Sequence, residues 1–182
     1  MAVSSTLLRE LKRAMKETQQ QMIKAEVAAL NRAAATALAR TIRFIRKKYK
    51  IKLQDIKPYT TLIKANKNKR SVQIRVKGQA IPLYKFGAKV MGKTSKKRGH
   101  VVATEQVGKR KTYKGAFIAT GPKFGKEAVF IRKGKERGPI RELLGPSAMA
   151  LFTSEQAEKE LELIFRERFQ IEMDRAINHF VK

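Results

Sequence analysis

The chain has 182 residues, with 42 Lys and Arg against 15 Asp and Glu, which gives a formal net charge of +27. This length is sufficient for one domain with a hydrophobic core, and a hydrophobic fraction of 42% argues against a fully disordered chain. The absence of Cys excludes disulfides, thiolate metal sites and cysteine nucleophiles, and the lack of a signal peptide or a long apolar run predicts a soluble protein without a membrane partner.

The N-terminal region, from about Ser5 to Lys48, has the composition of one long helix, or of two helices separated by a kink. It contains neither Pro nor Gly and is rich in strong helix formers. Apolar residues recur near heptad spacing at Leu8, Leu11, Met15, Met22, Ala25, Ala29 and Ala33, and the stripe continues through Leu30, Ala34, Ala37, Leu38, Ile42 and Ile45. We expect the second half to pack in the core and the first half to contact another subunit, with a core helix throughout as the alternative.

After this helix the sequence changes from a helical period to a strand period. Residues 51–58 predict a short helical turn that is stopped by Pro58. Residues 71–77 alternate between apolar and polar side chains, which is typical of a half-buried strand. Thr60–Ile63 is expected to pair with that strand across a turn at residues 65–68.

Three further short strands are predicted at residues 101–103, 116–120 and 128–131. Glycines and one Gly-Pro pair separate them, which is typical of turns. Neighbouring strands without intervening helices indicate an antiparallel sheet or a small barrel. The basic stretch at residues 91–114 is interpreted as a flexible arm or a hairpin at its start and end.

Positive charge is concentrated in the middle of the chain. Residues 43–135 carry 28 Lys or Arg and three acids, a net charge of +25, whereas residues 136–182 have a net charge of −2. Such a segment attracts a polyanion or an acidic protein surface. Interleaved aromatic side chains could stack on nucleic-acid bases, although core packing is the other reading of Tyr84, Phe86, Tyr113, Phe117 and Phe124. The candidate polyanion or partner contacts are Lys93, Lys96, Lys97, Arg98, Lys109, Arg110, Lys111 and Lys114.

The end of the chain predicts a second helix that begins at a capping-box pattern in residues 153–156. One face is apolar, with Ala157, Leu161, Ile164, Phe165, Ile171, Met173, Ile177 and Phe180. The other face is acidic, with Glu155, Glu158, Glu160, Glu162, Glu167, Glu172 and Asp174. The acidic face is either a solvated surface or an electrostatic dock for the basic sheet of a neighbouring subunit.

Residues 87–94, Gly-Ala-Lys-Val-Met-Gly-Lys-Thr, match the phosphate-loop pattern of nucleotide hydrolases. In those enzymes the loop opens a helix, and a second acid helps to hold Mg²⁺. The following residues, Ser-Lys-Lys-Arg-Gly-His, are a poor helix start, and neither Asp55 nor Asp174 ends an apolar strand. We therefore set the nucleotide-hydrolase reading aside.

Other catalytic patterns are weaker still. His100 and His179 have no metal-ligand spacing, and no nucleophile-elbow pattern is present. Glu160 and Glu162 project from different sides of their helix, so solvation explains them better than acid–base catalysis. The sequence predicts no catalytic residue, no metal and no cofactor, and hence a protein that is not an enzyme.

Several segments in a fixed order carry a family resemblance. They are the Ala-Leu-Asn-Arg of residues 29–32, Ile-Pro-Leu-Tyr-Lys-Phe-Gly-Ala at 81–88, Gly-Ala-Phe-Ile-Ala-Thr at 115–120, Val-Phe-Ile-Arg-Lys-Gly at 129–134, and the run at 139–147 that ends in Gly-Pro-Ser. This series resembles the minor tail protein Z family of tailed bacteriophages and prophages. The resemblance extends from about residue 29 to residue 147.

The resemblance implies a structural virion protein that completes the head-proximal end of a long phage tail, as a ring subunit that links the tail to the head connector. The implied partners are other copies of the chain, tail tube, terminator or head–tail connector proteins, and genome DNA. The implied location is the virion tail, with the host cytoplasm during assembly. A candidate assembly loop, which could equally be an ordinary connection from sheet to helix, contains Pro139, Ile140, Arg141, Leu143, Leu144, Gly145 and Pro146.

The sequence thus predicts an α+β fold with a long N-terminal helix, a central antiparallel β-sheet with a basic arm or hairpin, and a C-terminal helix. We expect one domain with an N-terminal helical region at residues 1–50, a basic β-rich core at 51–147 and the C-terminal helix at 148–182. The alternative function is non-specific nucleic-acid binding through residues 43–135.

Overall fold

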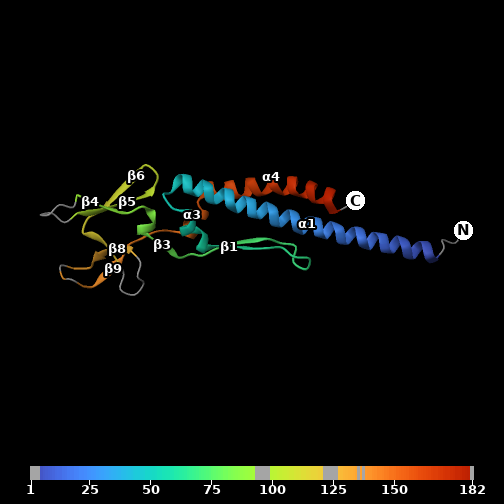
Figure 1. Ribbon diagram of the computed structural model, residues 1–182, viewed down its shortest axis with the longest axis horizontal. Helices are drawn as coiled ribbons and strands as arrows, with labels where there is room; N and C mark the ends of the chain where they lie inside the picture. Colours follow the sequence, from blue (N-terminus) through green and yellow to red (C-terminus); the bar gives the residue numbers. More distant parts are fainter. Residues whose placement is uncertain (1–4, 93–98, 121–126, 135, 137, 181–182) are drawn as a thin grey trace. The chain divides into compact units, whose positions relative to one another are not determined.

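The computed structural model describes residues 5–92, 99–120, 127–134, 136 and 138–180 (Figure 1). The chain divides into two compact units. The helical unit comprises residues up to 40, 62–75 and from 159 onward, and the strand-rich unit comprises residues 41–61 and 76–158. The predicted α+β fold is confirmed: a long N-terminal helix and a C-terminal helix are accompanied by several small antiparallel sheets.

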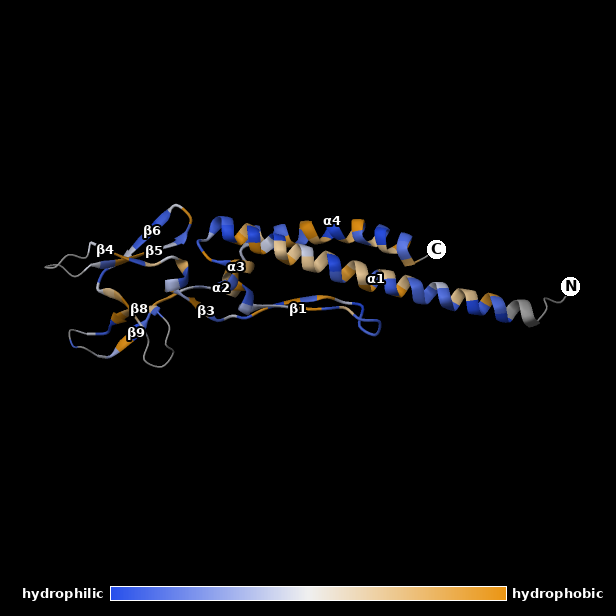
Figure 2. Cartoon of the chain, viewed as in Figure 1, coloured by the Kyte–Doolittle hydropathy of each residue, from blue (hydrophilic) through white to orange (hydrophobic). Residues whose placement is uncertain are grey.

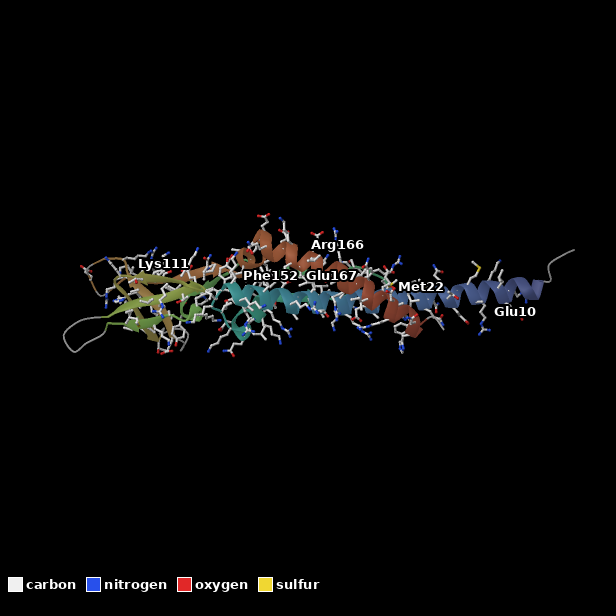
Figure 3. The ribbon with its side chains drawn as sticks, turned by 90° about the horizontal axis from the view of Figure 1, so that it is seen from above. Glu10, Met22, Lys111, Phe152, Arg166 and Glu167 are labelled. Carbon is white, nitrogen blue, oxygen red and sulfur yellow. The ribbon has the colours of Figure 1, made fainter. Side chains whose placement is uncertain are left out.

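The helical unit is built on an antiparallel pair of helices, α1 (Ser5–Lys48) and α4 (Glu155–Phe180), whose residues 5–40 and 159–180 belong to it and lie side by side in Figures 1 and 3. Ala25 and Ala29 of α1 pack against Ala176 of α4. Small side chains on both helices permit a close approach, and larger α4 side chains close the seam: Phe169, Met173, Ile177 and Phe180. The predicted core role of the Ala-rich stretch of α1 is confirmed by its buried residues Ala33, Ala34 and Ala37.

A ribbon of two strands, β1 (Thr60–Ile63) and β2 (Gln73–Val76), provides the remaining part of the helical unit. The predicted pairing of these strands and the half-buried alternation of β2 are confirmed. Asn31 of α1 fixes the adjoining backbone, since its amide donates to the carbonyl of Ala65 at 3.0 Å and its carbonyl accepts from the N–H of Ala65 at 2.8 Å. Asn31 therefore satisfies both polar groups of one residue where the chain leaves β1.

Glu172 of α4 is a correction to the predicted acidic face. It is buried, and its carboxylate meets Arg32 at 3.8 Å, Arg168 at 3.9 Å and Arg175 at 3.0 Å. A buried carboxylate needs such partners, because its desolvation is costly when it is left unpaired. Glu172 is therefore a structural anchor of the helical unit, and it is not part of a solvated surface.

The strand-rich unit contains short elements around a common core. Its helices are α2 (Leu53–Ile56) and α3 (Ala148–Phe152), with 3₁₀ turns η1 (Lys57–Tyr59) and η2 (Leu83–Phe86). Its strands are β3 (Ala80–Pro82), β4 (Lys89–Met91), β5 (His100–Gln106), β6 (Lys109–Tyr113), β7 (Ala116–Thr120), β8 (Glu127–Arg132), β9 (Ile140–Glu142) and β10 (Leu144–Ser147). The buried core residues include Leu83, Ala88, Val101, Ala103, Ala116 and Val129.

The strands of this unit form three small sheets in the described residues, where the sequence predicted one central sheet. The sheet orders are β10–β3, β4–β5–β6 and β7–β8–β9, all with antiparallel pairs. The predicted strand at residues 116–120 has the expected bounds, and those near 101–103 and 128–131 are longer than expected. Val101 and Ala103 of β5 and Ala116 and Val129 of β7 and β8 share one buried cluster, so two of these sheets contribute to the same core.

The junction between α3 and α4 differs from the predicted capping box. The Thr153 hydroxyl donates to the carbonyl of Met149 at 3.0 Å, and the Ser154 hydroxyl donates to the carbonyl of Leu151 at 3.0 Å. The Gln156 side chain accepts from Nζ of Lys48 at 2.9 Å. A side-chain cap is instead found on α3, where the Ser147 hydroxyl accepts from the N–H of Ala150. This short helix was not predicted from the sequence.

Candidate functional site

The basic hairpin, defined here as β5 and β6 from His100 to Tyr113, carries part of the predicted polyanion surface. Val101 pairs with Tyr113 and Ala103 with Lys111 across the hairpin, and the apolar partners Val101 and Ala103 point into the core. Residues 91–114 were predicted to form either a flexible arm or a hairpin, and the structure has a hairpin at residues 99–114. Lys109, Arg110, Lys111 and Lys114 are all exposed, and Figures 2 and 3 show β6 as hydrophilic and Lys111 on this strand. The other candidate contacts, Lys93, Lys96, Lys97 and Arg98, lie outside the described residues.

The acids near this hairpin are engaged by tyrosines. The Tyr113 hydroxyl donates to Glu105 within the hairpin, and burial followed by this hydrogen bond raises the pKa of Tyr113 above its usual value. The Tyr84 hydroxyl donates to Glu127, and this bond is the first cause that raises the pKa of Tyr84. Within the described chain no salt bridge involves the β6 bases, so the positive field of the hairpin is directed to solvent.

The aromatic residues that could have stacked on nucleic-acid bases are mostly engaged in packing. Phe86 is fully buried, and Tyr84 and Tyr113 pack against the core of the strand-rich unit. The Phe117 ring lies 6.1 Å from that of Phe130 and 5.2 Å from the Arg132 guanidinium. Phe124 lies outside the described residues. Core packing therefore explains Phe86, Tyr84 and Tyr113, whereas Phe117 is half-buried beside Phe130 and Arg132, and the exposed bases remain the candidate polyanion contacts.

The predicted assembly loop at residues 139–147 is found as strands instead, which corrects its conformation. Most of it belongs to β9 and β10, because backbone pairing to β8 and β3 gives the segment a place in two sheets. The backbone of Leu143 joins them: its N–H donates to Val129 at 2.8 Å, and its carbonyl accepts from the N–H of Leu83 at 3.0 Å. Pro139, Ile140, Arg141 and Leu144 are exposed, whereas Leu143, Gly145 and Pro146 are partly covered.

Gly145 has a packing role within this segment. A Cβ atom at this position would lie 2.6 Å from Cε2 of Phe86, which is too close for any real side chain. The buried Phe86 ring therefore rests directly on the glycine backbone. The Gly-Pro-Ser run is accounted for by this contact and by the capping hydroxyl of Ser147, and the exposed residues beside it are the ones available to a partner.

The phosphate-loop match has a different structure from that of a nucleotide hydrolase. Gly87 ends η2 in a left-handed conformation with φ 68°, and Lys89–Met91 is β4, an edge strand paired with β5. Lys93 and Thr94 lie outside the described residues. Within the described residues, no cluster of His, Asp or Glu could hold a metal ion, and no helix has the length and hydropathy to cross a bilayer.

Two apolar surfaces of the helical unit are uncovered. Residues 9–20 of α1 are exposed throughout, including Leu11 and Met15, and the predicted subunit contact of this half stays a prediction. On α4, Leu163 and Ile171 are also exposed; Ile171 was predicted to lie on the apolar face of this helix, and Leu163 was not predicted to belong to it. The sequence could have revealed this exposed surface through helical spacing, because Leu163, Glu167 and Ile171 lie four residues apart and share one face of the helix.

A family model described as prophage minor tail protein Z matches residues 7–182, which is nearly the whole chain. Neither a curated protein nor a solved structure matches the chain. The match extends beyond the segments that carried the resemblance and includes both long helices. It indicates a structural role in a phage tail.

Proposed function

This chain belongs to the prophage minor tail protein Z family, and we propose that it is a ring subunit that completes the head-proximal end of a phage tail and links it to the head connector. The family match over residues 7–182 carries this proposal. The uncovered helix surfaces and the basic hairpin support it, because each supplies an exposed surface for a protein or polyanion partner. The role is structural, without catalysis, and is taken up during assembly in the host cytoplasm.

The proposed partners follow from this position. Other copies of the chain form the ring, and tail tube, terminator or connector proteins bind its two sides. Ile140, Arg141 and Leu144 are exposed on β9 and β10, and we assign the contact with such a neighbouring tail protein to them. The backbone of this segment is held by two sheets, so these side chains are presented on a fixed scaffold.

A deletion of the coding sequence tests the joining role. Induced cells that lack the protein should contain filled heads and tails that are not joined, and expression of the full chain from a plasmid should restore complete particles. Complementation with Ile140→Asp/Leu144→Asp should fail, whereas an exposed control change, Met149→Asp, should restore joining. Complete particles in the absence of the protein would contradict the proposal.

A second function, contact with nucleic acid through the basic hairpin, is favoured by one observation: Lys109, Arg110 and Lys111 are exposed and free of salt bridges in the described part of the chain. Contact would be to phosphates without sequence reading. Replacing all three by Glu should weaken binding of a non-specific duplex and reduce the slope of log affinity against log salt by about 3. The matched control replaces Lys64, Lys67 and Lys69, which are also exposed. Equal losses in both variants, or no binding at low salt, would reject a hairpin site.

A further inference from the structure

The apolar face of α1 that packs on α4 continues toward the N-terminus beyond the end of α4. Ala25 and Ala29 meet the last turns of α4, and the same face continues toward the N-terminus as Leu11, Met15 and Met22. These three side chains are 59%, 66% and 39% exposed. Figures 1 and 3 show α1 running past the end of α4, with the labelled Glu10 on this part and the labelled Met22 near the end of α4. Residues 9–22, called the α1 extension, thus form about 20 Å of helix whose apolar stripe is uncovered at Leu11 and Met15 and partly covered at Met22.

The surface of α4 that faces away from α1 has the complementary character. Leu163 and Ile171 are 56% and 41% exposed, and Glu167 and Asp174 lie on the same face by helical spacing. We call these four residues the α4 outer face. The opposite side of α4 carries Ala176, Phe169 and Met173, which pack on α1. The α4 outer face is therefore free to bind a second helix without disturbing the first contact.

The charges of the two surfaces are opposite once internal ion pairs are removed. In the α1 extension Arg13 pairs with Glu17 at 3.2 Å, which leaves Arg9, Lys12 and Lys16 against one further acid, Glu10. On α4, Glu162 pairs with Arg166 at 2.8 Å, whereas Glu167 and Asp174 form no salt bridge within the described residues. Two α1 extensions placed together would repel each other, because both carry the excess of bases.

We infer that the α1 extension of one copy docks on the α4 outer face of the next copy. Leu11, Met15 and Met22 cover Leu163 and Ile171, and Lys12, which flanks this stripe by helical spacing, lies beside Glu167 and Asp174. The inference rests on the proposed ring, whose self-contact it specifies. Each copy then offers one donor surface and one acceptor surface, and such a head-to-tail contact generates a closed ring when the rotation between copies closes.

Directed disulfide formation tests this contact, and the chain is suited to it because it has no Cys. Met15→Cys and Leu163→Cys are made in separate full-length chains of different tag length, and the two are mixed and oxidised, both as purified protein and in assembled tails. The mixed product of the two variants is expected. Ala35→Cys, on an exposed part of α1 outside the extension, replaces Met15→Cys as the matched control and should give no mixed product.

The outcomes separate this inference from the ring itself. A Met15→Cys variant that links mainly to itself would show that two α1 extensions meet, and the absence of any product in both preparations would show that neither surface is used; each result overturns the inference. A ring observed in tails with either result would leave the proposed function standing. A mixed product without any such ring would support the contact and contradict the function.

A charge exchange provides a second test that does not depend on cysteine chemistry. Glu167→Lys and Lys12→Glu should each reduce the mass of the assembled species, and the double variant should recover it, because the attraction is restored with its sign reversed. Both positions are exposed, so each chain should keep its helical circular dichroism signal. Failure of the double variant to exceed the single variants would overturn the pairing.

Discussion

The helical unit and the strand-rich unit handle a large excess of bases in different ways. In the helical unit, carboxylates lie among the bases: Glu172 is buried between three arginines, and Glu26 pairs with Arg70 at 3.1 Å. In the strand-rich unit, Asp55 pairs with Lys85 at 3.3 Å, whereas Glu105 and Glu127 accept hydrogen bonds from tyrosines and the bases of β6 face solvent. The first arrangement stabilises a helix pair, whereas the second leaves a positive field available to a partner. We therefore propose the exposed bases of the strand-rich unit as the site at which a polyanion or acidic protein binds.

The largest expected effect is on the core of the strand-rich unit. Phe86 is fully buried, and its replacement by Ala should lower the free energy of unfolding by about 3–5 kcal/mol, because it removes buried surface and leaves a cavity. Thermal or denaturant unfolding measures the loss. Hydrogen exchange should place the loss in residues 76–158, and an equal loss of protection in α4 after residue 159 would contradict the division into two units.

Gly145→Ala should cost about 1–3 kcal/mol, because the added methyl group would be forced into the Phe86 ring. Gly134→Ala is the matched control, since a Cβ atom there meets nothing within 4 Å. Equilibrium unfolding of the two variants gives the comparison. If both variants were equally stable, the packing account of the Gly-Pro-Ser run would be wrong, and a partner contact would be the better explanation.

Glu172→Gln tests the corresponding anchor of the helical unit. The loss of charge should reduce stability by about 1–3 kcal/mol, since the guanidinium of Arg168 is largely covered and loses its anionic partner. Glu162→Gln removes an exposed ion pair of the same helix and should cost less than about 1 kcal/mol. A Glu172 variant as stable as the Glu162 variant would show that the buried carboxylate contributes nothing to the helix pair.

The smallest expected effect concerns pH in the basic hairpin. Because the folded-state pKa of Tyr113 is raised, the folded protein favours the neutral hydroxyl; its stabilising contribution is complete below pH 10 and is lost as the pH rises above that value. Tyr113→Phe should make the decline of stability above pH 10 shallower. In an absorbance titration, the Tyr113→Phe variant should lack one tyrosine that, in the unaltered protein, ionises at a higher pH than a free tyrosine. If the titration curve of the variant were unchanged, the raised pKa would not belong to Tyr113.

The sequence predicted the long elements well, because their signals are local. A stretch of 44 residues without Pro or Gly is one helix, and the alternation at residues 71–77 is a strand. The division of the strands into small sheets was not predicted, because it depends on contacts between distant segments, such as Leu143 with Val129 and Leu83. The 139–147 segment was taken for a loop for the same reason.

The candidate surfaces were predicted only in part. The exposed bases of β6 and the uncovered start of α1 follow from charge and periodicity. The burial of Glu172 had a signal that was overlooked, since it lies three residues after Phe169 and four before Ala176 on the packed face of α4. No sequence signal indicated the close approach of Gly145 to Phe86, because the two residues are far apart in the sequence.

Imaging of purified tails by electron cryomicroscopy tests the central claim most directly. A density ring built from copies of this chain should lie at the head-proximal end of the tail, and a tag on the C-terminus should add density to that ring alone. Tails that lack the chain, or that carry it along the tube or at the distal tip, would contradict the account.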